Sequence, residues 1–134
     1  MMHRVVALSG LWLLGLAACV PQKHTATDTI PLVFQGRWAL TPADCEPGRA
    51  DAKGLMVVDD TTLRFYESRG RLQQATLSAS TQLQGTFDFN GEGQHWFSQE
   101  TLTVRDTGQT LIREPSDTAA LPDVLTYQRC AAAR

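Results

Sequence analysis

Two short polar stretches of this 134-residue chain hold the side chains best suited to binding or catalysis. Residues 66–70 read Tyr-Glu-Ser-Arg-Gly, and residues 92–96 bring an acid, a histidine and a tryptophan close together. On loops of a rigid scaffold, where binding residues concentrate, such charges and an aromatic ring can hold a partner. We therefore predict a binding rim formed by Glu67, Arg69, Arg71, Glu92, His95 and Trp96.

The same residues do not form a catalytic pattern. Ser68 has no histidine nearby in the sequence, and a nucleophilic serine needs a base. The spacing of Glu67, Glu92 and Glu100 brings no two carboxylates together, as glycoside hydrolysis would require. A phosphate-binding glycine loop, metal-ligand spacing and a CxxC pair are all missing. We expect a non-enzymatic protein without a cofactor or metal, and solvated hairpin ends are the simpler interpretation of the polar stretches.

The N-terminus has the order of an export signal. A positively charged lead that ends at Arg4 precedes an apolar run over residues 5–16. This run is too short to span a bilayer, which takes about 20 apolar residues, but has a normal length for a signal peptide. Small residues then precede Cys19 in the run Leu-Ala-Ala-Cys, which resembles the lipobox of bacterial lipoproteins. The resemblance implies that residues 1–18 are removed and that acyl chains such as palmitate are attached to Cys19. An unmodified cysteine beside a cleaved signal is the alternative.

The lipobox resemblance also implies a location. Two or more acyl chains hold a protein firmly to a membrane, whereas one chain holds it only marginally. Val20 follows the cysteine in place of the aspartate that is associated with inner-membrane retention in enteric bacteria. We therefore expect a protein of the cell envelope that faces the periplasm, anchored in the outer membrane rather than the inner one.

The charge of the mature chain argues against nucleic acid as a partner. Removal of residues 1–18 takes away one of the 12 basic side chains and none of the 14 acidic ones, leaving 11 against 14 over 116 residues. A nucleic-acid-binding protein shows a basic footprint, and this balance gives none. The length suits one small domain.

Cys45 and Cys130 remain once Cys19 is assigned to the lipid anchor. In an oxidising periplasm, a disulfide is the expected state of two such thiols. A zinc site is the alternative, but two isolated cysteines without nearby histidines make a poor coordination sphere. We predict a Cys45–Cys130 disulfide.

The mature chain divides into a tether and an all-β domain. Residues 19–32, rich in proline and small polar residues, predict a lipid-anchored flexible tether, and residues 33–134 hold the domain. Alternating apolar residues and turn signals predict short strands, the clearest at residues 83–89, followed by the hairpin signal Asn90-Gly91. The predicted strands cover residues 34–40, 54–58, 62–67, 71–79, 83–89, 95–98, 101–105, 110–113 and 124–130, with a turn at 68–70 and an irregular loop at 41–48. We predict a small antiparallel meander barrel, closed by the disulfide.

Gly36-Arg37-Trp38 resembles the G-x-W motif of lipocalins and related calycin barrels. In that family the tryptophan packs across the closed end of the barrel, beside a basic residue from near the last strand. The resemblance implies that Arg129 takes that place here. The start Gly-Arg-Trp-Ala-Leu followed by Cys45 also resembles small periplasmic protease inhibitors of the calycin type, in which the cysteines pair locally.

Three functions agree with these patterns. We expect a lipid-anchored binding or accessory module of the cell envelope, whose partners are the membrane and a small apolar ligand or an envelope protein. An inhibitor of an exported hydrolase, of the protease or lysozyme type, is the first alternative. A structural envelope component is the second. A carrier should contain an apolar cavity, whereas an inhibitor should present a rigid protruding segment.

Overall fold

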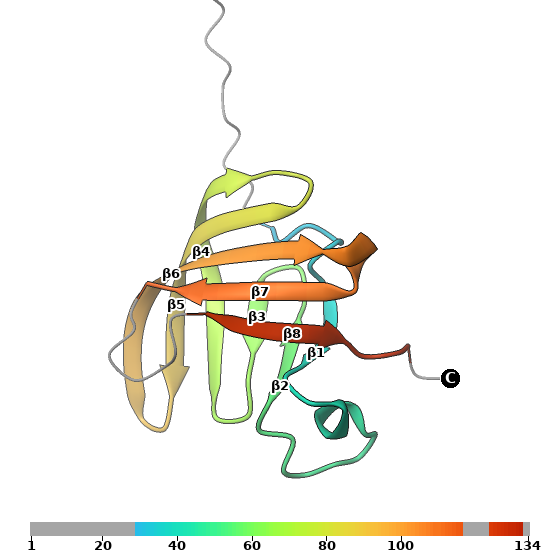
Figure 1. Ribbon diagram of the computed structural model, residues 1–134. Coiled ribbons are helices and arrows are strands. Elements are labelled where there is room, and N and C mark those ends of the chain that lie inside the picture. Colours follow the sequence, from blue (N-terminus) through green and yellow to red (C-terminus); the bar gives the residue numbers. More distant parts are fainter. Residues whose placement is uncertain (1–28, 117–123, 133–134) are drawn as a thin grey trace, which may run out of the picture.

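Eight antiparallel strands close into a barrel in the computed structural model, which describes residues 29–116 and 124–132 (Figure 1). Each strand pairs with the next along the chain, and the last pairs with the first. The strands are β1 (Gly36–Ala39), β2 (Leu55–Val58), β3 (Thr62–Arg64), β4 (Ser68–Ser78), β5 (Gln82–Gly91), β6 (Gln94–Arg105), β7 (Thr110–Pro115) and β8 (Leu125–Arg129). The predicted all-β meander barrel is therefore confirmed.

The predicted signal, Cys19 and the tether up to residue 28 lie outside the described residues, as do residues 117–123 of the loop between β7 and β8. Within the described ranges, no helix is long and apolar enough to cross a bilayer.

The core lies inside the barrel because side chains of a strand alternate between its two faces. On β5, Leu83, Gly85, Phe87 and Phe89 are buried, and the residues that alternate with them are more exposed. The largest fully buried apolar side chains are Trp38, Phe34, Phe87, Phe89, Ile30, Met56, Leu63, Leu83, Leu102 and Leu111.

The predicted strand boundaries differ most from the structure in two places. The predicted break between residues 98 and 101 does not exist, because β6 runs without interruption from Gln94 to Arg105. The predicted turn at residues 68–70 lies earlier, where the Phe65 amide donates to the Ser68 carbonyl and β4 begins at Ser68. Gly70 is buried inside β4, and a Cβ there would lie 2.5 Å from Cζ of Phe89. A glycine is needed at this position for close packing rather than for a turn.

The loop after β1 contains a short 3-10 helix, η1 (Pro42–Cys45), where the sequence predicted only irregular structure. The Asp44 carboxylate accepts hydrogen bonds from the Thr41 hydroxyl at 2.7 Å and from the Gly54 amide at 3.2 Å. The hydrogen bond from Thr41 is the main reason why the pKa of Asp44 lies below its usual value. Pro42 is the first residue of η1, and proline is compatible with this position because its missing N–H is not needed in the first turn of a helix.

The predicted disulfide between Cys45 and Cys130 is present, with the two Cα atoms 5.4 Å apart. It joins the end of η1 to the residue that follows β8. Because β1 and β8 are also neighbours in the barrel, the bond reinforces the place where the first and last strands meet.

One end of the barrel is closed by Trp38 and Arg129. The Arg129 guanidinium lies 4.0 Å from the centroid of the Trp38 ring, in the position that the resemblance to the lipocalin motif implies. Arg129 donates to the carbonyl groups of Val33, Gln35 and Gly108 at 2.6–2.8 Å. The Trp38 indole donates to the Phe34 carbonyl at 2.7 Å. These contacts fill this end of the barrel with side chains and well-paired backbone.

Candidate functional site

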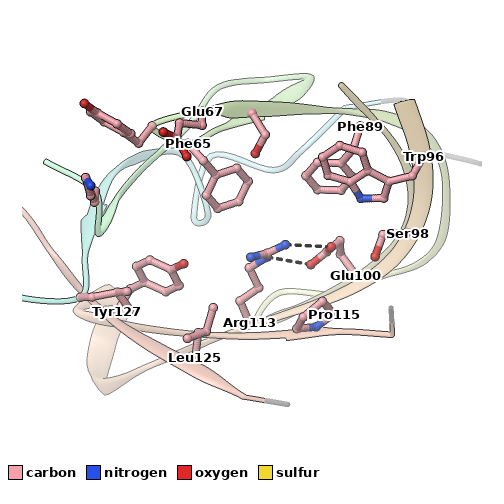
Figure 2. A pocket seen from close by; sticks show the side chains of 14 residues that line it. Phe65, Glu67, Phe89, Trp96, Ser98, Glu100, Arg113, Pro115, Leu125 and Tyr127 are labelled. Atoms are coloured by element: carbon pink, nitrogen blue, oxygen red, sulfur yellow. Dashed lines mark hydrogen bonds and ion pairs between the residues drawn. The ribbon is translucent and has the colours of Figure 1, made fainter. Parts of the chain in front are cut away.

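The opposite end of the barrel contains a cavity of about 470 Å³ (Figure 2). Its lining comes from the segment between β3 and β4, from the paired strands β5 and β6, and from the end of β7 and the start of β8. Leu40 and Lys53, near the two ends of the connection from β1 to β2, complete it. Its lining residues are Leu40, Lys53, Phe65, Tyr66, Glu67, Ser68, Phe89, Trp96, Ser98, Glu100, Arg113, Pro115, Leu125 and Tyr127.

Aromatic side chains form one wall of the cavity. Phe89 at the end of β5 and Trp96 at the start of β6 face each other across the hairpin, with parallel rings whose centroids are 5.3 Å apart. Phe65 lies 6.2 Å from Phe89. Offset-stacked and tilted aromatic pairs of this kind are favourable beyond their buried area. The wall therefore offers an apolar aromatic surface, in which the Phe89 and Trp96 rings are nearly parallel and the Phe65 ring is tilted.

A buried ion pair lies deeper in the cavity. The Arg113 guanidinium on β7 donates to the Glu100 carboxylate on β6 through Nε at 2.8 Å and through Nη2 at 3.0 Å. Only 6% of Arg113 and 2% of Glu100 are exposed. Figure 2 shows the two side chains joined by both bonds, across from Phe65, Phe89 and Trp96. Such a pair must be well matched, because taking two charges out of water is costly.

Aromatic rings also shield the cation of this pair. Cζ of Arg113 lies 4.6 Å from the centroid of the Phe65 ring and 5.9 Å from that of Phe89. A guanidinium over an aromatic face is attracted by the electrons of the ring. Arg113 is therefore fixed both by Glu100 and by the wall of the cavity.

Tyr127 on β8 points toward Arg113 from the other side of the cavity (Figure 2). Burial raises the pKa of Tyr127 above its usual value, because it disfavours the charged phenolate. The phenol hence stays protonated at neutral pH and can both donate and accept a hydrogen bond. Ser98, also buried, adds a second hydroxyl to the lining.

The predicted binding rim is split by the barrel wall. Glu67 and Trp96 line the cavity. Arg69 and Arg71 are exposed and alternate with the buried Gly70 on β4, so they face outward. The remaining two predicted residues, Glu92 and His95, lie at the exposed β5–β6 hairpin tip and just after it.

His95 contacts groups on the outside of the barrel. Its Nε2 contacts the Asp88 carboxylate, and its ring stands edge-on to exposed Phe97, with centroids 5.3 Å apart. Cross-strand pairing places Arg71 beside the same Asp88. The predicted rim residues on β4 and β6 are therefore divided between two faces of the sheet.

Sequence reasoning did not single out Arg113 and Tyr127, and it considered Glu100 only as a catalytic carboxylate. The signal was available in the continuous strand β6, where every second residue from Trp96 onward faces inward: Trp96, Ser98, Glu100, Leu102 and Val104. The sequence prediction ended one strand at residue 98 and began the next at residue 101, so it left Glu100 outside both strands and missed that its carboxylate faces inward. On β7, Arg113 likewise follows the buried Leu111 by two positions.

The cavity can hold a small molecule by apolar contact and hydrogen bonding. Among residues 29–116 and 124–132, no three histidine, cysteine, aspartate or glutamate side chains gather into a group that could bind a metal ion. Comparison of the chain with protein-family models, with curated proteins and with solved structures finds no match.

Proposed function

We propose that this protein is a lipid-anchored lipoprotein of the bacterial cell envelope, whose barrel acts as a non-enzymatic binding module for a small ligand. The observation that carries the proposal is the cavity of about 470 Å³ at the open end of the barrel. Its volume falls in the range of about 300–1,000 Å³ that is typical of small-molecule sites. Its aromatic wall and its few buried polar groups are the usual composition of such sites.

Native mass spectrometry of residues 20–134, exported to a periplasm and purified without detergent, tests the binding function. We expect a mass excess that disappears on denaturation. The mass of the bare chain alone, from preparations at several growth conditions, contradicts the proposal.

A matched pair of variants ties the bound mass to the cavity. Leu125→Trp places a large ring at the cavity lining and should remove the excess mass. Thr126→Trp, the exposed neighbour on the same strand, should keep it because its side chain lies on the other face. Equal occupancy in the two variants contradicts binding inside the barrel.

The anchor depends on Cys19, in the Leu-Ala-Ala-Cys run of the sequence. We expect Cys19→Ser to abolish incorporation of labelled palmitate and to release the protein from the membrane fraction, because the sulfur is the acceptor of the lipid. Membrane fractionation on a density gradient should place the lipidated wild type in the outer membrane. The control is Cys45→Ser, which removes a different thiol and should leave labelling intact. Labelled Cys19→Ser protein contradicts the lipobox.

A further inference from the structure

We infer that the cavity selects an uncharged, flat and mostly apolar ligand that carries a hydroxyl, carbonyl or amide group, and that it discriminates against the acid or amine of the same shape. This inference rests on the proposed binding function and specifies the chemical class of the ligand. Its basis is the balance of charge among the groups that line the cavity.

The buried charges of the cavity already neutralise each other. Arg113 uses Nε and Nη2 to hold both carboxylate oxygens of Glu100. Nη1 of Arg113 makes no hydrogen bond to Glu100, but a ligand carboxylate that reached it would bring a second negative charge beside the Glu100 carboxylate. A ligand ammonium would have the same difficulty with Arg113. A buried charge without a partner of its own is strongly disfavoured, so either ion loses affinity.

Neutral polar groups of a ligand meet suitable partners at the same depth. The protonated hydroxyl of Tyr127 can donate to a carbonyl or accept from a hydroxyl or amide. Ser98 offers a second hydroxyl, whose own hydrogen bond to the Gln99 carbonyl is long, at 3.4 Å. Satisfying these groups requires no new charge in the barrel.

The aromatic wall sets the shape of the ligand. Phe89 and Trp96 lie with their ring planes only 10° apart, so they present a flat stack at the side of the cavity. A planar ring system can extend such a stack or meet it edge-on, and aromatic contacts favour both arrangements.

The charged residues at the mouth of the cavity do not favour ligands of either charge. Lys53 and Glu67, of opposite sign, both line it. Lys53 Nζ lies 5.8 Å from the centroid of the exposed Tyr66 ring. Opposite charges at one opening largely cancel the field that would steer an ion inward.

Three probes with one ring system separate charge from shape: a naphthol, the matching naphthoate and the matching naphthylmethylamine. At about pH 7 the first is uncharged, the second is an anion and the third is a cation. Isothermal titration of residues 20–134 with each probe measures the three affinities. We expect the naphthol to bind at least about tenfold more tightly than either ion, the difference that results from leaving one buried charge unmatched.

A charge variant makes the reason for this preference testable. Glu100→Gln keeps the shape of the side chain and leaves Arg113 with an unmatched positive charge. We expect naphthoate to bind this variant at least about tenfold more tightly than it binds the wild type, and the ratio of naphthoate affinity to naphthol affinity to rise at least about tenfold. Glu114→Gln is the matched control, because Glu114 is exposed on the same strand as Arg113. This substitution removes the same negative charge outside the cavity.

The outcomes separate this inference from the proposed function. Wild-type protein that binds naphthoate or the amine as tightly as naphthol overturns the inference and leaves the binding function standing. If Glu100→Gln does not fold, the affinities of the wild-type protein for the three probes decide whether the inference holds. If no probe binds but native mass spectrometry finds a ligand, a charged ligand overturns the inference and an uncharged one supports it. If neither method finds binding, the proposed function fails and the inference fails with it.

Discussion

Replacing Arg113 alone with methionine is expected to lower the free energy of unfolding by about 3–5 kcal/mol, because the change leaves Glu100 buried without its partner. Arg113 is 6% exposed and Glu100 is 2% exposed, so water that enters the cavity can hydrate only a small part of the carboxylate that the change leaves unpaired. This is a large part of the total stability of a domain of this size, which is roughly 5–15 kcal/mol. Urea unfolding followed by circular dichroism measures the change.

The double variant Glu100→Met with Arg113→Met separates the cost of an unpaired charge from the worth of the pair. Apolar side chains of similar volume often replace a buried ion pair without loss of stability. We therefore expect the double variant to recover most of what the single variant loses. Glu114→Met, at an exposed position of the same strand, should change stability by less than about 0.5 kcal/mol. A single variant as stable as the wild type would show that the pair is solvated.

Reduction of the Cys45–Cys130 disulfide is expected to destabilise the barrel by about 4–5 kcal/mol. The bond links residues 85 positions apart, and a cross-link over so long a loop strongly restricts the unfolded chain. For a domain of this length, we expect the melting temperature to fall by more than about 10 °C. Thermal unfolding with and without a reducing agent gives the difference.

The variant with both Cys45→Ser and Cys130→Ser controls for effects of the reducing agent itself. Its melting temperature should match that of the reduced wild type and should not respond to the reagent. Identical melting of oxidised and reduced wild type would mean that other contacts hold the ends of the barrel together. The pairing of β1 with β8 and the hydrogen bonds from Arg129 to the carbonyl groups of Val33 and Gln35 are the contacts to examine in that case.

The barrel was predictable because most of its inward positions are apolar. Residues 83–89 show this best, since Leu83, Gly85, Phe87 and Phe89 mark one buried face at every second position. The disulfide was predictable for a different reason. With Cys19 assigned to lipid, only one pairing of thiols remains, so no geometry is needed to choose it.

The cavity could not be predicted because its inward positions break the apolar pattern. Glu100, Arg113 and Ser98 face the interior, yet a reading based on hydropathy assigns such residues to the solvent or to a strand end. Gly70 was predicted to form a turn because glycine is a typical turn residue, although here the Phe89 ring occupies the space where a side chain would be. The register pairs Arg113 on β7 with Leu102 on β6, two residues from Glu100, and only this register shows that the acid and the arginine meet.

The prediction of a binding rim failed to distinguish the two faces of the sheet. Arg71 and Glu67 are close in sequence, but one lies on the outside of β4 and the other lines the cavity. A turn placed at residues 68–70 would have kept both on one loop. A shift of a predicted turn by a few residues therefore changes which charged side chains are assigned to a site.

The disulfide has a consequence for proteolysis. All of β2 to β8 lies between Cys45 and Cys130 in the sequence. A protease that cuts one peptide bond anywhere between these two cysteines produces two segments that the disulfide still holds in a single molecule. Strand pairing around the barrel then keeps the segments in place. A second cut is needed before any piece of the barrel can leave, so one nick neither shortens the molecule nor separates the cavity from the N-terminal part of the chain.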